Sequence, residues 1–196
     1  MKHPMLAAIA AILTALPVFA ALNSGASAPD FSAQASLAGK SFAFSLAEAR
    51  RSGPVVVYFY PSAFTEDCNV QAHEFAVKMD KFKAAGATVI GVSLDNITRL
   101  NAFSADPKYC GGKVPVASDA DGKIAKSYDL KVAAEAQGFK DTRGVEIGHG
   151  FAERTTFVVT RDGKIAATIG GLAPNVNVDH ALAEVQRLSA AGKPGS

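Results

Sequence analysis

The stretch PVVVYFYP, residues 54–61, decides the fold of this 196-residue chain. Its interior is entirely β-branched or aromatic and a proline bounds each end, which is typical of a strand buried on both faces. Residues 64–85 follow with helical spacing of apolar side chains, and Gly86 is a natural helix stop. The apolar positions of this predicted helix are Val70, Phe75, Met79 and Phe82. A second apolar run, TVIGVSL at residues 88–94, completes a strand–helix–strand unit and predicts that the two strands are parallel.

The remaining pattern predicts a hairpin and a closing helix. Asp162-Gly163 lies between two β-rich runs at 155–160 and 164–169, a strong hairpin signal. Other expected elements are a helix capped by Asp95-Asn96 and ending near Ala105, a short strand at 114–117, a short helix opened by Asp119 or Asp121, and an amphipathic helix at 178–188. The order of parallel unit, hairpin and helix predicts an α/β, thioredoxin-like fold, with a central mixed sheet flanked by helices.

The N-terminus has the pattern of an export signal. A short basic start precedes an almost wholly apolar run at residues 5–22, and Val18-Phe19-Ala20 fits a small-x-small cleavage site. We therefore expect residues 1–20 to be a signal peptide, residues 21–196 to form a single domain, and the protein to be exported, to the periplasm. An uncleaved anchor is the alternative, and only then would the chain contact a membrane, through this segment.

Composition excludes several classes of protein. With 20 Lys+Arg against 18 Asp+Glu the net charge is +2, and no basic run of four occurs, so we expect no nucleic-acid partner. Two cysteines exclude a disulfide-rich scaffold and any four-cysteine metal site, so we expect no metal or other cofactor. In an exported chain Cys68 and Cys110 are either a structural disulfide, with a loop-entropy contribution of about 4 kcal/mol, or a reactive thiol with its partner. Their spacing does not decide between the two.

The junction between the first strand and its helix carries the candidate chemistry. It places Cys68 in the first helical turn, where free backbone N–H groups and the helix dipole stabilise a thiolate. Thr65 is positioned to cap the helix and face the thiol, and Pro61 can shield one side of the sulfur. The charges of Glu66 and Asp67 oppose a lowered thiol pKa, so a nearby cation is required.

Residues 61–68 match the peroxiredoxin motif Pro-x-x-x-Thr-x-x-Cys, and the chain resembles that family over roughly residues 28–190. The resemblance is closest to the Q-type, bacterioferritin comigratory protein-like branch. Further similar segments are APDF at 28–31, GVSLD at 91–95, the stretch from Ser118-Asp119 through Gly122-Lys123 to Tyr128, and RTTFV at 154–158 followed by DGKI at 162–165.

The resemblance implies a thiol peroxidase that reduces hydrogen peroxide and organic hydroperoxides. Cys68 would be the peroxidatic nucleophile and would become a sulfenic acid. Thr65 and Arg154 would hydrogen-bond the peroxide, and Arg154 would also offset Glu66 and Asp67. A thiol reductant such as a thioredoxin-like protein would complete the cycle, and the chain would be a monomer or dimer.

The resolving cysteine departs from the Q-type pattern. Many members carry it five residues after the peroxidatic one, where this chain has His73, an expected helix-surface residue. Other members carry it after the second strand, which corresponds to Cys110, and the adjacent Gly111-Gly112 would help that loop move. The resemblance therefore favours Cys110 as the resolving thiol over a structural disulfide, with a one-cysteine mechanism as a third possibility.

Three other features have no assigned role. Gln71 stands where the family often has Glu, residues 131–153 form a long connection that could be a lid or an interface, and His149 and His180 are expected to be structural or solvent-facing.

Two rival functions remain open. A disulfide exchanger of thioredoxin fold would need a C-x-x-C pair, but Thr65 and Gln71 flank Cys68 at that spacing. A non-catalytic domain with a structural disulfide leaves Thr65 and Arg154 unexplained.

Overall fold

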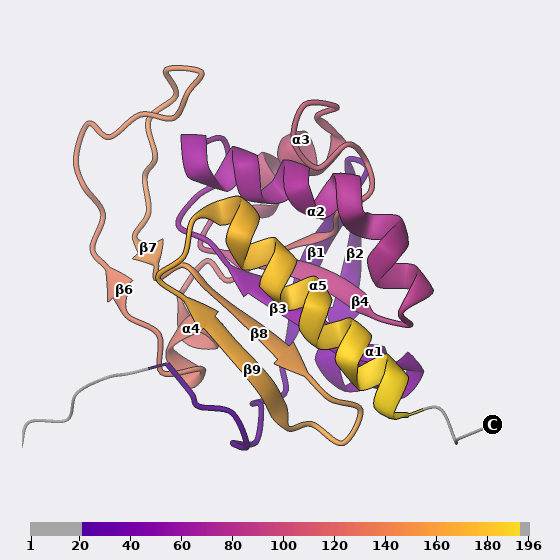
Figure 1. Cartoon of the computed structure of the whole chain (residues 1–196). Helices are drawn as coiled ribbons and strands as arrows, with labels where there is room; N and C mark the ends of the chain where they lie inside the picture. Colours follow the sequence, from indigo (N-terminus) through magenta and orange to yellow (C-terminus); the bar gives the residue numbers. More distant parts are fainter. Residues whose placement is uncertain (1–20, 193–196) are drawn as a thin grey trace, which may run out of the picture.

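The structure is a computed structural model that describes residues 21–192, so the expected signal peptide lies outside the described residues. A seven-stranded mixed sheet forms the centre, in the order β2-β1-β5-β4-β3-β8-β9, with a separate two-stranded sheet of β6 and β7 (Figure 1). The strands are β1 (Ser32–Leu37), β2 (Lys40–Ser45), β3 (Val55–Phe59), β4 (Thr88–Ser93), β5 (Val116–Ser118), β6 (Val132–Ala133), β7 (Phe151–Ala152), β8 (Thr155–Val159) and β9 (Ile165–Gly170). The helices are α1 (Leu46–Ser52), α2 (Glu66–Ala84), α3 (Ile97–Ala105), α4 (Lys123–Ser127) and α5 (Pro174–Ala191).

The predicted strand–helix–strand unit is confirmed. Strand β3 is buried at every residue and pairs parallel to β4, while α2 connects them. The hairpin of β8 and β9 is also confirmed, and β8 pairs antiparallel to β3, which makes the sheet mixed. One core assignment in the helix is wrong: Val70 is 46% exposed, because it lies on the outer face of α2.

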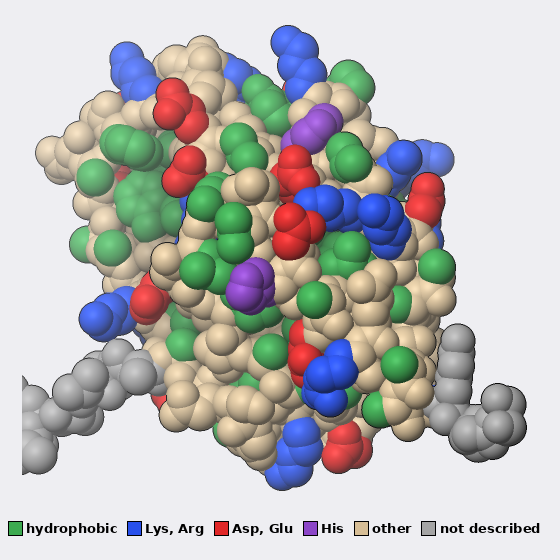
Figure 2. All heavy atoms as spheres, viewed as in Figure 1, with side chains coloured by type: hydrophobic (Ala, Val, Ile, Leu, Met, Phe, Trp, Pro, Cys, Tyr) green, Lys and Arg blue, Asp and Glu red, His purple; other side chains and the backbone are tan. Residues whose placement is uncertain are grey.

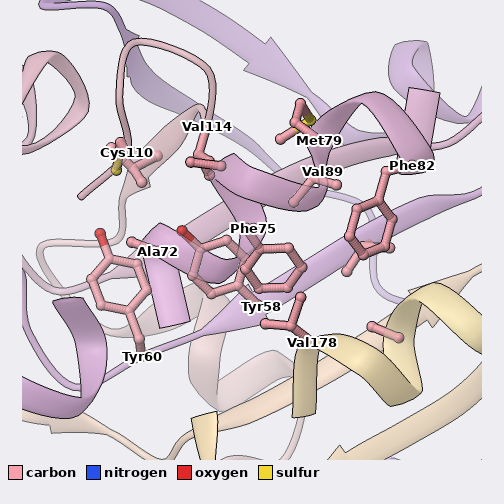
Figure 3. Packing of buried hydrophobic residues seen from close by; sticks show 14 of the residues in the cluster. Tyr58, Tyr60, Ala72, Phe75, Met79, Phe82, Val89, Cys110, Val114 and Val178 are labelled. Carbon is pink, nitrogen blue, oxygen red and sulfur yellow. The ribbon is translucent and has the colours of Figure 1, made fainter. Parts of the chain in front are cut away.

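The sheet divides the core into two clusters. Alternate side chains of β3 point to opposite faces, so Val56 and Tyr58 belong to one cluster, and Val55 and Val57 to the other. Helices α2, α3 and α5 contribute to the first cluster, and α2 and α5 lie across the face of the sheet in Figure 1. Phe75 stacks on Tyr58 in this cluster, with ring centroids 4.4 Å apart (Figure 3).

The sequence patterns missed β1, β2 and α1. The outer strand β2 buries only Phe44, and its sequence KSFAFS does not alternate strictly between polar and apolar residues. The turn between the two strands puts Ala38 and Gly39 in the left-handed region, at φ of 50° and 79°. Helix α5 begins at Pro174, four residues before the apolar pattern starts. No helix in residues 21–192 is long and apolar enough to cross a membrane.

Candidate active site

Cys68 lies in the first turn of α2, as predicted. The helix begins at Glu66, and Cys68 is only 2% exposed. Thr65 occupies the N-cap position, but the predicted side-chain cap is wrong, because its hydroxyl donates instead to the carbonyl of Ser62 at 2.8 Å. That bond closes the turn that leads from β3 into the helix.

Arg154 is the cation that lies beside Cys68 and can offset the negative charges of Glu66 and Asp67. Because Thr155 is paired with Phe59 at the end of β3, the residue before β8 lies beside the loop that follows β3. Arg154 Nη2 donates to Cys68 Sγ at 3.4 Å, and Nη1 donates to the Gln71 side-chain oxygen at 2.7 Å. Both arms of the guanidinium therefore have a partner, and one of them is the thiol.

The carboxylate of Asp95 anchors the loop before Cys68. It is fully buried two residues after β4 and accepts hydrogen bonds from Ser62 Oγ at 2.9 Å, Ala63 N at 2.7 Å and Ser93 Oγ at 2.7 Å. His149 Nε2 lies 2.8 Å from the same carboxylate, and Arg99 Nε forms an ion pair with it at 2.8 Å. This network fixes two loop residues on the approach to the helix.

Asp95 and His149 each favour the charged form of the other. Burial by itself raises the pKa of Asp95, but the hydrogen bond and charge of His149, with the other donors, keep it below its ordinary value. Burial by itself lowers the pKa of His149, but Asp95 and the carbonyl of Gly150 raise it above its ordinary value. Both ring nitrogens of His149 face acceptors, since Nδ1 lies 2.7 Å from that carbonyl, which is the arrangement an imidazolium satisfies.

The long connection 131–153 folds back against the same loop. Thr142 donates to the carbonyl of Phe64 through its backbone N at 2.9 Å and its hydroxyl at 2.8 Å. The Arg143 guanidinium carbon lies 3.2 Å from the centre of the Phe64 ring, and Asp141 pairs with Arg99 and Arg143. Phe64 adopts φ of 63°, an unusual conformation for a bulky residue. The connection therefore holds the loop in a strained conformation next to Cys68.

A pocket of about 650 Å³ opens between α2 and this connection. Pro61, Thr65 and Arg154 line it at the Cys68 end, so the structure brings these three predicted residues together. Its other lining residues are Glu66, Asp67, Ala136, Phe139, Lys140, Asp141, Thr142 and Phe151. Figure 2 shows hydrophobic side chains gathered on the left, over the connection, with acidic side chains nearby. Ala136, Phe139 and Phe151 give the wall opposite the helix an apolar part, beside the polar side chains of Lys140, Asp141 and Thr142.

Cys110 is buried in the first core cluster, and both cysteines are free thiols. Figure 3 shows Cys110 in its loop close to Tyr60 and Ala72. Burial, followed by the charge of Asp106, raises the pKa of the Cys110 thiol far above its ordinary value. A thiol in this environment is protonated and inert until the loop opens.

The glycines beside Cys110 have a structural role. Gly111 and Gly112 lie in the left-handed region, at φ of 57° and 68°, and their N–H groups donate to Asp106 and Ser104 carbonyls at 2.9 and 3.0 Å. His73 is exposed on α2, and its Nδ1 lies 3.1 Å from the Lys108 carbonyl of this loop. The loop is thus ordered by a tight turn in the state described.

No metal centre is present in the part of the chain that the structure describes, since residues 21–192 contain no group of three or more His, Cys, Asp and Glu side chains placed to hold an ion. His180 is exposed on α5.

Comparison with known proteins gives one consistent result. Residues 24–168 match the sequence profile of the AhpC/TSA family. Peroxiredoxin Q from the chloroplast of Populus jackii is 31% identical over 174 residues, covering 87% of this chain and 71% of the relative. The chloroplastic 2-Cys peroxiredoxin BAS1 of Hordeum vulgare is 27% identical over 175 residues, covering 87% of this chain and 77% of the relative. The crystal structure of peroxidoxin BcpB from Mycobacterium tuberculosis aligns with a TM-score of 0.71 at 25% identity, covering 85% of this chain and 98% of that structure.

Proposed function

The chain belongs to the AhpC/TSA family of thiol peroxidases, and on that premise we propose that Cys68 is its peroxidatic nucleophile. The observation that carries this proposal is the 3.4 Å contact between Arg154 and the Cys68 sulfur in the first turn of a helix. The sulfur thus lies at a helix N-terminus and against a guanidinium, and a cysteine reacts with peroxide as its thiolate.

The first step oxidises Cys68 and reduces the peroxide. The thiolate attacks one peroxide oxygen, an S–O bond forms, and the O–O bond breaks. The other oxygen leaves with the electron pair of the broken bond and takes a proton to become water or an alcohol. Cys68 is left as a sulfenic acid.

The surrounding residues stabilise this step. The guanidinium of Arg154 faces the developing negative charge of the leaving oxygen. The hydroxyl of Thr65 donates its hydrogen bond to the Ser62 carbonyl. Its oxygen can therefore accept a hydrogen bond from the O–H group of an incoming peroxide and orient it. Pro61 lines the pocket without adding a competing backbone donor.

We assign the resolving step to Cys110. The Cys110 thiol gives up its proton, its thiolate attacks the sulfenic sulfur, and an S–S bond forms as the S–O bond breaks; the leaving hydroxide takes up a proton and departs as water. Because Cys110 is buried and its pKa is raised, its loop and the first turn of α2 must open before this step. A thioredoxin-type dithiol then reduces the disulfide by exchange and is itself oxidised.

The pocket supports organic hydroperoxides as substrates beside hydrogen peroxide. Phe139 is 49% exposed on the wall opposite α2, and Phe151 lies against it with ring centroids 5.6 Å apart. An alkyl or aryl group of the substrate would cover these rings while the peroxide group lies near Arg154. Hydrogen peroxide would gain nothing from them.

Export to the periplasm is part of the proposal. It rests on the apolar run and cleavage pattern of residues 1–20, and on the use of a disulfide cycle in an oxidising compartment. Mass spectrometry of the protein isolated from cell fractions tests it, with an N-terminus at residue 21 as the expected result.

A single assay tests the catalytic assignment. With dithiothreitol as reductant, wild type should consume peroxide and Cys68→Ser should not. In a separate reaction without dithiothreitol, Cys110→Ser should form a sulfenic acid that dimedone traps at Cys68. Consumption by Cys68→Ser at the wild-type rate would refute the assignment.

A further inference from the structure

A series of hydrogen bonds between buried side chains, called the relay below, connects Arg154 to the backbone of β9. Gln71 on α2, Asn177 on α5 and Thr156 on β8 are all fully buried. Gln71 accepts from Arg154 Nη1 at 2.7 Å, and its Nε2 donates to Asn177 Oδ1 at 3.1 Å. Asn177 Nδ2 in turn donates to the Ile169 carbonyl of β9 at 3.0 Å. The guanidinium is thus connected to a backbone carbonyl through two amides.

The direction of every bond in this chain follows from its fixed end. A backbone carbonyl can only accept, so Asn177 must turn its NH₂ group toward Ile169 and its oxygen toward Gln71. Gln71 must then turn its own NH₂ group toward Asn177, which leaves its oxygen facing Arg154. The Thr156 hydroxyl donates to the same Asn177 oxygen at 2.6 Å. At the other end the Arg154 guanidinium can only donate, which requires the same orientation of Gln71.

The placement of the four elements makes the chain rigid. Thr156 lies in β8, two positions after Arg154, which directly precedes the strand. Asn177 lies in the first turn of α5, and its own backbone N–H is bonded to Ala173 at 2.9 Å. A shift of either amide would leave a fully buried donor or acceptor without a partner, which is costly.

We propose that Asn177 is a positioning residue that holds Arg154 against the Cys68 sulfur, acting through Gln71. This inference rests on the proposed role of Arg154 and extends it to a residue 23 positions further along the chain, on α5. Because both amides are neutral, the relay orients the guanidinium without offsetting its charge, which stays available to the thiolate and the leaving oxygen.

The test is a double-mutant cycle. The measured quantity is the rate at which Cys68 reacts with hydrogen peroxide, determined by competition kinetics. Asn177→Leu keeps the volume and removes the amide, and Gln71→Leu removes the next link. Each should slow the reaction between about tenfold and about a hundredfold, as expected for a misplaced catalytic group. The double variant should be no slower than the slower single variant, because both remove the same connection.

The controls separate positioning from loosening of the fold. Asn175→Leu changes an exposed asparagine in the same turn of α5 and should keep the wild-type rate. Alkylation of Cys68 by iodoacetamide should not become faster in Asn177→Leu, whereas a loosened structure would expose this buried thiol and accelerate it. Should Asn177→Leu fail to fold, Asn177→Ser, which is too short to reach Gln71, replaces it in the cycle.

The outcomes decide between the relay and its premise. A wild-type rate in folded Asn177→Leu, or additive losses in the double variant, would overturn the relay while a slow Arg154→Ala leaves the proposed function standing. A wild-type rate in Arg154→Ala would instead overturn the proposed role of the arginine itself.

Discussion

Replacing His149 by leucine should destabilise the protein in a pH-dependent way. The imidazole is bonded to the fully buried Asp95 carboxylate at 2.8 Å and is largely buried itself, with 16% of its side chain exposed. A hydrogen bond between charged groups contributes about 1.5–3 kcal/mol. The loss of one partner of a buried ion pair costs about 3–5 kcal/mol when the other charge is left alone. In His149→Leu, Asp95 keeps its ion pair with Arg99 and three neutral donors. We therefore expect the free energy of unfolding to fall by about 2 kcal/mol near pH 6.

The sign of the pH dependence follows from the raised pKa of His149. A group whose pKa is raised on folding contributes its full stability below its unfolded pKa, about 6.5 for histidine, and loses it as the pH rises through the folded value. The pKa of Asp95 is lowered, so its contribution is present above about pH 3.9 and is lost as the pH falls through the folded value. The difference between wild type and His149→Leu should therefore be largest near pH 6 and shrink toward pH 9. The positive charge of Arg99 opposes the protonation of His149, so it limits how far above about pH 6 the stabilisation by the charged imidazole extends.

Urea unfolding at about pH 6 and about pH 9 measures this difference, and the thermal midpoint near pH 6 should fall by about 4–8 °C. His180→Leu is the matched control, because this histidine is exposed on α5. A destabilisation that is equal at both pH values, or larger at the higher one, would refute the ionised pair.

Three further outcomes follow from the site. Arg154→Ala should slow sulfenic-acid formation by about a hundredfold to a thousandfold, the cost of about 2.7–4 kcal/mol for losing one preorganised donor, and a near wild-type rate in competition kinetics would make Arg154 a surface charge. Phe139→Ala should lower kcat/KM for cumene hydroperoxide by about tenfold and leave kcat/KM for hydrogen peroxide unchanged, because only the aryl substrate reaches this wall. An equal loss for both substrates would contradict the pocket assignment. Oxidation to the Cys68–Cys110 disulfide should add little stability or remove some, because local order is lost in forming it; a gain near the 4 kcal/mol of a simple loop closure, measured by melting oxidised and reduced protein, would make the bond structural.

The sequence predicted the parts of the site that are contiguous. Pro61, Thr65 and Cys68 lie within one junction, where a buried strand runs into an amphipathic helix, so their neighbourhood follows from local pattern alone. Arg154 came from the family resemblance, since an arginine before a strand is ordinarily a solvated charge. The structure adds the reason for its position, which is the antiparallel pairing of β8 with β3.

The residues that support the site could not be read from the sequence. Asp95, His149 and Asn177 are isolated polar residues on three elements, and only the tertiary fold makes them buried partners. In the sequence Gln71 is only a departure from the family pattern, whereas in the structure it links Arg154 to α5. Residues 131–153 have no helical or strand periodicity, so their packing against Phe64 depends on Thr142 and Arg143 contacts that leave no pattern.

Trapping the oxidised form of Cys68 tests the central claim most directly. Reduced protein is treated with one equivalent of hydrogen peroxide in the presence of dimedone, and the modified residue is identified by mass spectrometry in wild type, Cys110→Ser and Cys68→Ser. The account predicts a dimedone adduct at Cys68 that accumulates in Cys110→Ser, since resolution is blocked there, and no adduct in Cys68→Ser. An adduct at Cys110 in wild type with none at Cys68, or undiminished peroxide consumption by Cys68→Ser, would contradict it.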